Sequence, residues 1–221
     1  IVHYLPVTDH DERWGIVCTT AGYQNVPPGS PYPLTQHPDS YSFTRSRGRV
    51  LGEYQLLYIV SGQGEFRSAS SPAAPVKAGT VVMLFPDEWH TYAPDPETGW
   101  EEWWVGFRGE NIDRRVAEGF FSPKTPLLHI GHSAGIVSCY QEIIRSAEEE
   151  RKGFQQLVTG IVLHLLGSVL FKRDNLQYLD NPIVEKINRA REMMRRHIGD
   201  NLPPEEIARR LNIGYTWFRR T

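Results

Sequence analysis

Cysteine is scarce in this chain, and its scarcity excludes two common ways of stabilising a small fold. The 221 residues contain two cysteines, Cys18 and Cys139, which lie far apart in segments of different character. A disulfide framework needs more cysteines, and a structural zinc site needs clustered ligands at short spacing. The sequence therefore predicts two buried thiols in a reducing compartment.

Membrane and secretion signals are also lacking. No continuous apolar run reaches the roughly 20 residues that span a bilayer. The start of the chain has no basic segment followed by an apolar one, as a signal peptide would. These absences predict a cytoplasmic protein with no membrane partner. Because the first residue is Ile1 and not Met, we expect the natural N-terminus to lie upstream.

Net charge is small, at −2, but it is unevenly distributed. Residues 181–221 hold nine Lys and Arg against five Asp and Glu, and the rest of the chain holds fifteen against twenty-one. A basic end on an acidic body is typical of a DNA-binding segment attached to another domain, although the same charges could form an ordinary solvated face. The length allows one large domain or two modest ones.

Residues 1–108 have the pattern of β-structure. Strands are predicted at 14–20, 41–45, 54–60, 80–85 and 102–107, where aromatic and β-branched residues are frequent. Turn signals at 61–64, 77–79 and 95–99 separate them. Many short strands with regular turns predict a sandwich or a barrel. The proline-rich stretch 26–38 cannot form a central strand, so we expect an arm or loop over the barrel.

The last residues, PEEIARRLNIGYTWFRRT at 204–221, predict a helix-turn-helix. Apolar Ile207, Ala208 and Leu211 share one helix face, residues 212–214 form a tight turn, and a second helix starts at Tyr215. This second helix stops after about two turns, so we expect a fragment of a longer regulator. A preceding helix is predicted from Pro182 to about Ile198, after a linker at 175–181.

Residues of the predicted second helix are candidates for contact with the major groove of DNA. Tyr215, Thr216 and Arg219 are expected to reach base edges, and Arg209 and Arg220 are expected to meet phosphates.

Between the β-region and this end, the pattern is helical. Helices are predicted near 136–147 and from Phe154 to about Lys172. The second has a wider apolar face than a one-sided surface helix. Both flanks could be buried in one monomer. We favour a homodimer through the 136–172 helices, because helix-turn-helix proteins usually read paired half-sites.

Aromatic residues concentrate in one part of the β-region: Trp89, Tyr92, Trp100, Trp103, Trp104 and Phe107, with Tyr54 and Tyr58 on a nearby predicted strand. Neighbours such as Trp103 and Trp104 must face opposite sides of a strand. Some of these rings belong to the core. A barrel interior lined by others, with Arg45, Arg47 or Arg49 at its rim, would suit a small polyhydroxylated ligand. Tyr58 and Trp104 are candidate lining residues.

The stretch YQLLYIVSGQGEF…VKAGTVVMLFPDEWHTYAPDPETGWEEWWVGFRG resembles the sensor domain of AraC/XylS-family transcription regulators, and EEIARRLNIGYTWFRR resembles their first helix-turn-helix. The resemblance implies an α+β protein in four parts. These are a cupin-like β-barrel of jelly-roll type at 1–109, a helical dimerisation segment at 110–174, the linker 175–181, and the truncated start of an all-α DNA-binding domain at 182–221.

The same resemblance implies a ligand-responsive transcriptional regulator without catalytic residues or a cofactor. Its partners would be promoter DNA, a small polar effector such as a sugar, a second copy of the chain and possible contact with RNA polymerase. Arg47, Tyr92 and Trp100 fall where sugar-responsive members have pocket residues.

The alternative is a metal-dependent cupin enzyme, such as an isomerase or dioxygenase, with a helical tail. Such a site needs several histidines and a carboxylate on adjacent strands. Residues 47–51 contain no His-x-His, and only His90 is suitably placed. We interpret His90 as a hydrogen-bonded structural residue and predict no metal.

Overall fold

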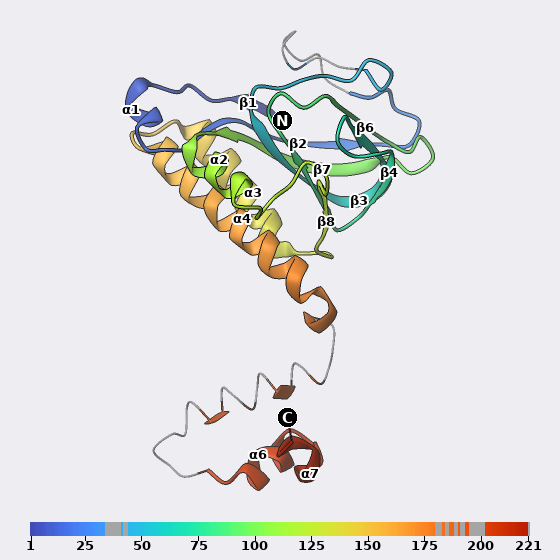
Figure 1. The fold of residues 1–221 in the computed structure, drawn as a ribbon, viewed down its shortest axis with the longest axis vertical. Helices are drawn as coiled ribbons and strands as arrows, with labels where there is room; N and C mark the ends of the chain where they lie inside the picture. Colours follow the sequence, from blue (N-terminus) through green and yellow to red (C-terminus); the bar gives the residue numbers. More distant parts are fainter. Residues whose placement is uncertain are drawn as a thin grey trace. The chain divides into compact units, whose positions relative to one another are not determined.

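The computed structural model describes residues 1–33, 41, 44–179, 183, 186–187, 190, 193–194 and 202–220. The chain divides into two compact units, Ile1–Arg173 and Asp174–Thr221. The first unit holds the β-structure and the helices packed on it, and the second includes two short helices near the C-terminus (Figure 1).

The strands of the first unit form two antiparallel sheets that share one strand. The larger sheet has the order β1 (Val2–Tyr4), β2 (Val17–Val26), β7 (Trp100–Arg108), β3 (Tyr54–Ser68), β5 (Thr80–Leu84) and β8 (Leu127–His129). The far half of β3 pairs with β4 (Ala74–Lys77) and β6 (His90–Pro94). An apolar cluster that includes Leu57, Phe66 and Trp104 lies inside this barrel. The α+β class and the barrel are as predicted.

The long strand β3 replaces a turn that the sequence predicts at 61–64. It continues to Ser68, with a register irregularity between Ile59 and Ser61. Gly62 has φ +81°, and a Cβ there would lie 2.1 Å from the carbonyl oxygen of Gly99. The glycine therefore permits a close approach of neighbouring backbone within a bent strand. The turn prediction is wrong for this reason.

Other strand predictions differ from the structure in extent. The strand predicted at 14–20 begins at Val17, and the described residues of 41–45 form no strand. Strands β1, β4, β6 and β8 and the short helix α1 (Asp9–Glu12) were not predicted. Within the predicted arm 26–38, residues 27–33 form no strand and residues 34–38 lie outside the described residues.

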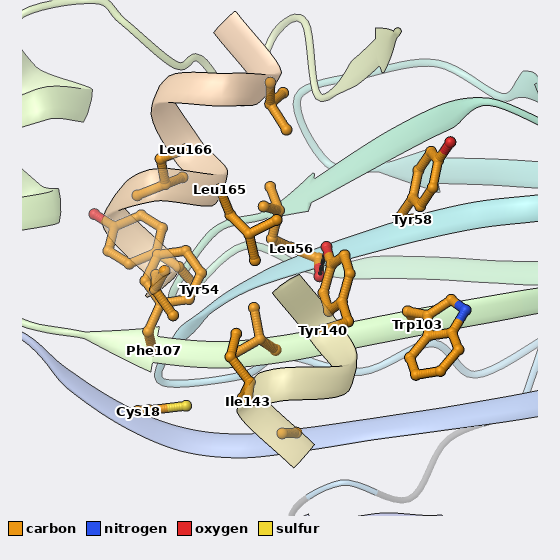
Figure 2. Packing of buried hydrophobic residues seen from close by; sticks show 14 of the residues in the cluster. Cys18, Tyr54, Leu56, Tyr58, Trp103, Phe107, Tyr140, Ile143, Leu165 and Leu166 are labelled. Carbon is orange, nitrogen blue, oxygen red and sulfur yellow. Dashed lines mark hydrogen bonds between the residues drawn. The ribbon is translucent and has the colours of Figure 1, made fainter. Parts of the chain in front are cut away.

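Helices α3 (Ala134–Glu149) and α4 (Phe154–Leu179) cover the outer face of the larger sheet, and α2 (Glu110–Ala117) follows β7 (Figure 1). Their buried residues, including Tyr140, Ile143 and Leu165, form one cluster with sheet residues such as Leu56 and Phe107 (Figure 2). Ser133 caps α3 by accepting from the backbone N–H of Ile136.

Helix α4 is longer than the sequence predicts. It continues to Leu179, so the end predicted near residues 173–175 is wrong, and residues 175–179 of the predicted linker are helical. Residues 180–181 lie outside the described residues.

The stretch Phe154–Leu176 has a mean hydropathy of 1.6 and is long and apolar enough to cross a membrane, by length and composition only. This corrects the expectation that no segment meets that test. Val158, Val162, Leu165 and Val169 of this helix are buried in the cluster with the sheet. Packing against the sheet accounts for the apolar composition of this face.

The second unit contains α6 (Pro204–Arg210) and α7 (Tyr215–Phe218). Ile207 and Ala208 are buried, and Asn212 has φ 50° in the turn between the two helices. Phe218 of α7 is half-buried. The described residues of the helix predicted after Pro182 are helical, and its other residues lie outside the described residues.

Candidate functional site

A polar cavity lies inside the barrel, between strands of both sheets and the loop that joins β2 to β3. Its side chains leave a cavity volume of about 30 Å³. The lining residues come from β1, β2, β3, β6, β7 and that loop: Val2, Tyr4, Thr20, Gln24, Tyr32, Pro33, Tyr41, Arg49, Gln55, Tyr92, Glu102 and Trp104. In this state the free space is of water size.

Strand register brings the polar side chains of β2 and β7 to one face. Gln24 pairs with Glu102, and Gly22 pairs with Trp104. Since side chains two apart on a strand share a face, all four positions face the barrel interior. A Cβ on Gly22 would lie 2.1 Å from Cζ2 of Trp104. Gly22 therefore leaves the space that the indole ring occupies.

The half-buried Arg49 joins several lining groups through its guanidinium. Its Nη2 donates to the hydroxyl of Tyr92 at 2.7 Å and to Oε1 of Gln55 at 3.3 Å, and its Nη1 donates to the carbonyl of Tyr41 at 2.7 Å. Its Nε donates to Nε2 of His90 at 3.2 Å. These contacts hold a positive charge beside the cavity in a fixed orientation.

His90 is neutral in this arrangement. Its Nδ1 lies 3.0 Å from the carbonyl oxygen of Glu88, so that nitrogen carries the proton and Nε2 accepts from Arg49. Burial lowers the pKa of His90 to about 4, and the charge of Arg49 acts in the same direction. Among the residues that the structure describes, no cluster of three or more His, Cys, Asp or Glu side chains could hold a metal ion.

Glu102 is a buried acid, 2% exposed, on the β7 side of the cavity. It accepts from Nε2 of Gln24 at 2.6 Å and from the hydroxyl of Tyr32 at 3.0 Å. Burial raises its pKa to about 7, against the lowering effect of these hydrogen bonds and of Arg49. Its protonation state therefore changes near neutral pH.

A second buried acid, Glu53, lies behind the lining residues and is 5% exposed. It accepts from the hydroxyl of Tyr41 at 3.1 Å, from Nε2 of Gln55 at 2.9 Å and from the hydroxyl of Thr20 at 3.4 Å. A Cβ on Gly106 would lie 2.4 Å from its Oε1. The cavity thus combines carboxylates, amides, phenols, a guanidinium and an indole, a set suited to binding a small polar molecule.

The structure brings some of the sequence-predicted ligand residues together. Tyr92 and Trp104 line the cavity. Trp100 lies just behind it, with its ring 6.2 Å from that of Tyr92 and 5.7 Å from that of Tyr32.

Two predicted ligand residues lie elsewhere. Tyr58 is in the core that faces the helices (Figure 2), where its hydroxyl donates to the carbonyl of Gly131 at 2.9 Å. Its strand partner is Trp103, on the opposite face from Trp104. Arg47 is exposed in a turn, and Arg49 is the arginine that lines the cavity.

The sequence reasoning named Tyr92 and, as one of three candidate rim arginines, Arg49, and it missed the other polar residues of the cavity. Gln24, Gln55 and Glu102 are buried polar residues within otherwise largely buried strands. Long polar side chains inside apolar strands were the available signal, because such groups are rarely buried without partners.

The predicted DNA-contacting residues lie on α6, on α7 and directly after α7. Thr216, Arg219 and Arg220 are exposed. Arg209 is also exposed and donates to both carboxylate oxygens of Glu206 at 2.8 Å. Tyr215 is half-buried, and a hydrogen bond with Glu205 raises its pKa.

A jelly-roll barrel with a polar cavity and helices on its outer face defines a cupin-like ligand-binding domain. The chain belongs to the AraC-like ligand binding domain family, whose family model matches residues 28–166. This match confirms the predicted kinship with AraC/XylS regulators and the cupin-like fold.

Among the relatives, the raffinose operon transcriptional regulatory protein RafR of Pediococcus pentosaceus is 29% identical over 94 residues, which are 41% of this chain and 34% of RafR. This chain therefore matches about a third of the length of that relative.

Solved structures with a similar fold include the AraC-like transcriptional activator CuxR, at 15% identity and a TM-score of 0.33, covering 80% of this chain and 69% of that one. ToxT from Vibrio cholerae matches at 9% identity and a TM-score of 0.33, covering 93% and 72%. A predicted oxalate decarboxylase from Thermotoga maritima matches at 20% identity and a TM-score of 0.30, covering 48% and 76%. The family assignment rests on the family match, because these scores are low.

Proposed function

We propose that this protein is a ligand-responsive transcriptional regulator without catalytic activity, acting in the cytoplasm. In this proposal the barrel cavity senses a small polyhydroxylated metabolite, a carbohydrate, and so controls DNA binding by the C-terminal helices. The observation that carries the proposal is the buried polar network around Arg49, Glu102 and Tyr92. Membership of a ligand-binding family and the similarity to a regulator of a raffinose operon support it.

The chemistry of the cavity supports a carbohydrate. Carboxylates accept hydrogen bonds from hydroxyls, and the guanidinium of Arg49 donates to ring or hydroxyl oxygens. Trp104 offers an indole to the apolar face of a sugar ring. A buried site of this kind gains specificity because every unmatched polar group costs free energy.

For the output side, we propose that Tyr215, Thr216 and Arg219 contact base edges in the major groove of promoter DNA. Arg209 and Arg220 would contact phosphates, and RNA polymerase would be a further partner. Arg219→Ala should weaken operator binding by about 1–3 kcal/mol in an electrophoretic mobility assay. An equal loss on unrelated DNA would make Arg219 a phosphate contact.

The domain organisation remains part of the proposal: an effector-binding barrel at 1–109, a helical dimerisation segment from 110, and a DNA-binding segment from 182. The homodimer would form through the 136–172 helices.

The test of the effector site is calorimetric titration with raffinose, galactose, glucose and arabinose. We expect at least one to bind, Arg49→Met to weaken binding more than tenfold, and Arg47→Met to leave it unchanged. The two arginines are two residues apart, but only Arg49 lines the cavity. If both variants weaken sugar binding equally, or if neither variant changes it, the ligand binds elsewhere. Stoichiometric iron, manganese, nickel or zinc in the purified protein would favour a metal-dependent enzyme.

A further inference from the structure

Two tyrosines from the loop between β2 and β3 occupy the two acidic sides of the cavity. The hydroxyl of Tyr32 donates to Glu102 at 3.0 Å, and the hydroxyl of Tyr41 donates to Glu53 at 3.1 Å. Both carboxylates are buried. Each loop tyrosine thus presents to a carboxylate the same group, a neutral O–H donor, that a sugar would present.

A buried hydrogen-bond acceptor beside Glu102, the side-chain oxygen of Gln24, receives no hydrogen bond from a hydroxyl group of the described residues. Nε2 of Gln24 donates to Glu102, which fixes the amide so that its Oε1 points away from the carboxylate. This Oε1 is buried and has no hydrogen-bond partner within the described part of the chain. Since Gln24 and Glu102 are paired across β2 and β7, the two acceptors lie next to each other on the cavity wall.

The space that is free in this state cannot hold a sugar ring. About 30 Å³ admits the centre of a water molecule, so some lining groups must move before a larger ligand binds. Gln24, Gln55 and Glu102 stand on strands held by ladder hydrogen bonds. Tyr32 and Tyr41 stand on a loop, so their hydroxyls can leave without breaking the sheet.

We propose that the hydroxyls of Tyr32 and Tyr41 occupy the places of ligand hydroxyls, and that the effector is a neutral polyol that displaces them. This inference rests on the proposed function of the cavity. Neighbouring hydroxyls of the polyol bond Glu102 and Oε1 of Gln24, and a hydroxyl on its other side bonds Glu53. The two buried carboxyl groups, Glu102 on the wall and Glu53 behind it, suit a neutral ligand better than a sugar acid or a sugar phosphate, because an ionised carboxylate repels an anion in a buried site.

The test uses Tyr32→Phe and Tyr41→Phe in the 221-residue chain. Both keep the ring and remove the competing hydroxyl. The matched control is Tyr54→Phe, because the hydroxyl of Tyr54 also donates to a carboxylate, that of Asp113 at 2.8 Å, but outside the cavity. Each protein is titrated calorimetrically with galactose, glucose, arabinose, myo-inositol and raffinose. Thermal unfolding of each variant checks that it is folded.

We expect the loop variants to bind the same sugar at least about tenfold more tightly than the unmodified chain, as the loss of one competing hydrogen bond to a carboxylate implies. Tyr54→Phe should change the affinity less than twofold. If a sugar binds the unmodified chain and the loop variants bind it no more tightly, the displacement is refuted and the proposed function stands. Equal tightening by Tyr54→Phe also refutes the displacement. If no sugar binds any of the proteins, both the ligand class and the proposed carbohydrate sensing are refuted.

Discussion

At the scale of single residues, burial sets the charge of the cavity. Glu102 and His90 are both buried, and burial disfavours the charged form of each. The pKa of Glu102 rises from 4.5 to about 7, and that of His90 falls from 6.5 to about 4. Between pH 4.5 and 6.5 both side chains are therefore mainly neutral in the folded protein.

The two shifts have opposite consequences for stability. Between pH 4.5 and 7 the folded state keeps a proton on Glu102 that the unfolded chain releases, so the free energy of unfolding falls as pH rises. For His90 the unfolded chain binds the extra proton between pH 4 and 6.5, so the free energy of unfolding rises with pH there.

We predict that Glu102→Gln removes the first of these effects. The stability of the unmodified protein relative to the variant should decrease by about 2–3 kcal/mol from pH 5 to pH 8, which corresponds to about two pKa units. Urea denaturation at a series of pH values measures this difference, in which the His90 contribution cancels. Parallel curves for the two proteins would mean that Glu102 titrates as an ordinary exposed acid.

The sequence could predict the aromatic part of this site but not its polar part. Tyr92 and Trp104 follow from the concentration of rings near β7. The cavity arginine had three candidates, and the choice depends on the turn at 44–48, where Gly48 has φ +63°. Such a turn decides which of Arg45, Arg47 and Arg49 faces inward, and the residue pattern alone does not reveal it.

At the scale of secondary-structure elements, glycines determine how closely the strands and side chains of the barrel approach. In β2, Gly22 faces the indole of Trp104 from the directly paired position. The indole fills the space where a side chain at residue 22 would lie. The position of the Trp104 indole in the cavity wall therefore depends on residue 22 having no methyl group.

We predict that Gly22→Ala destabilises the protein by about 1–3 kcal/mol and moves the ring of Trp104, because overpacking forces side chains off their rotamers. Urea denaturation and near-ultraviolet circular dichroism measure the two effects. Gly52→Ala is the control, since a Cβ there meets nothing within 4 Å. If Gly22→Ala is as stable as Gly52→Ala and its aromatic spectrum is unchanged, the packing argument is contradicted.

Elements with strong alternation or long apolar stretches were predictable, and bends within elements were not. The cores of β5 and β7 and the start of β3 were predicted from aromatic and β-branched runs. The pair Gly62 and Gly64 indicates a hairpin by local rules, but tertiary pairing with β4 and β6 keeps β3 extended beyond it. Short strands such as β8 have too few residues for a periodic signal.

At the scale of the whole molecule, the order of parts was predictable because charge and residue type change along the chain. The β-rich acidic body, the apolar helices and the basic end each have a distinct composition. The length of α4 was not predictable from these changes, since polar residues 172–175 continue the helix instead of ending it.

One face of α4 is exposed in the first unit. Residues 157, 160, 164, 167 and 171 are exposed and recur at alternating spacings of three and four, the spacing of a coiled-coil seam. Leu157 is 51% exposed and Phe171 is 62% exposed. A Cβ on Gly160 or on Gly167 would meet nothing within 4 Å, so a second helix can approach closely there. We define these five positions as the α4 stripe and propose that it joins two copies of the chain.

We predict that the double variant Leu157→Asp and Phe171→Asp weakens the dimer at least tenfold, because it buries a charge at each end of the seam. Sedimentation equilibrium measures the dissociation constant. Lys152→Glu, an exposed charge reversal in the turn before α4, should leave it unchanged.

Because the stripe lies opposite the residues that pack on the sheet, the double variant should keep its sugar affinity while losing cooperative binding to paired half-sites. A purely monomeric unmodified chain at high micromolar concentration would refute the dimer, and loss of sugar binding with dimerisation intact would show that the stripe supports the barrel.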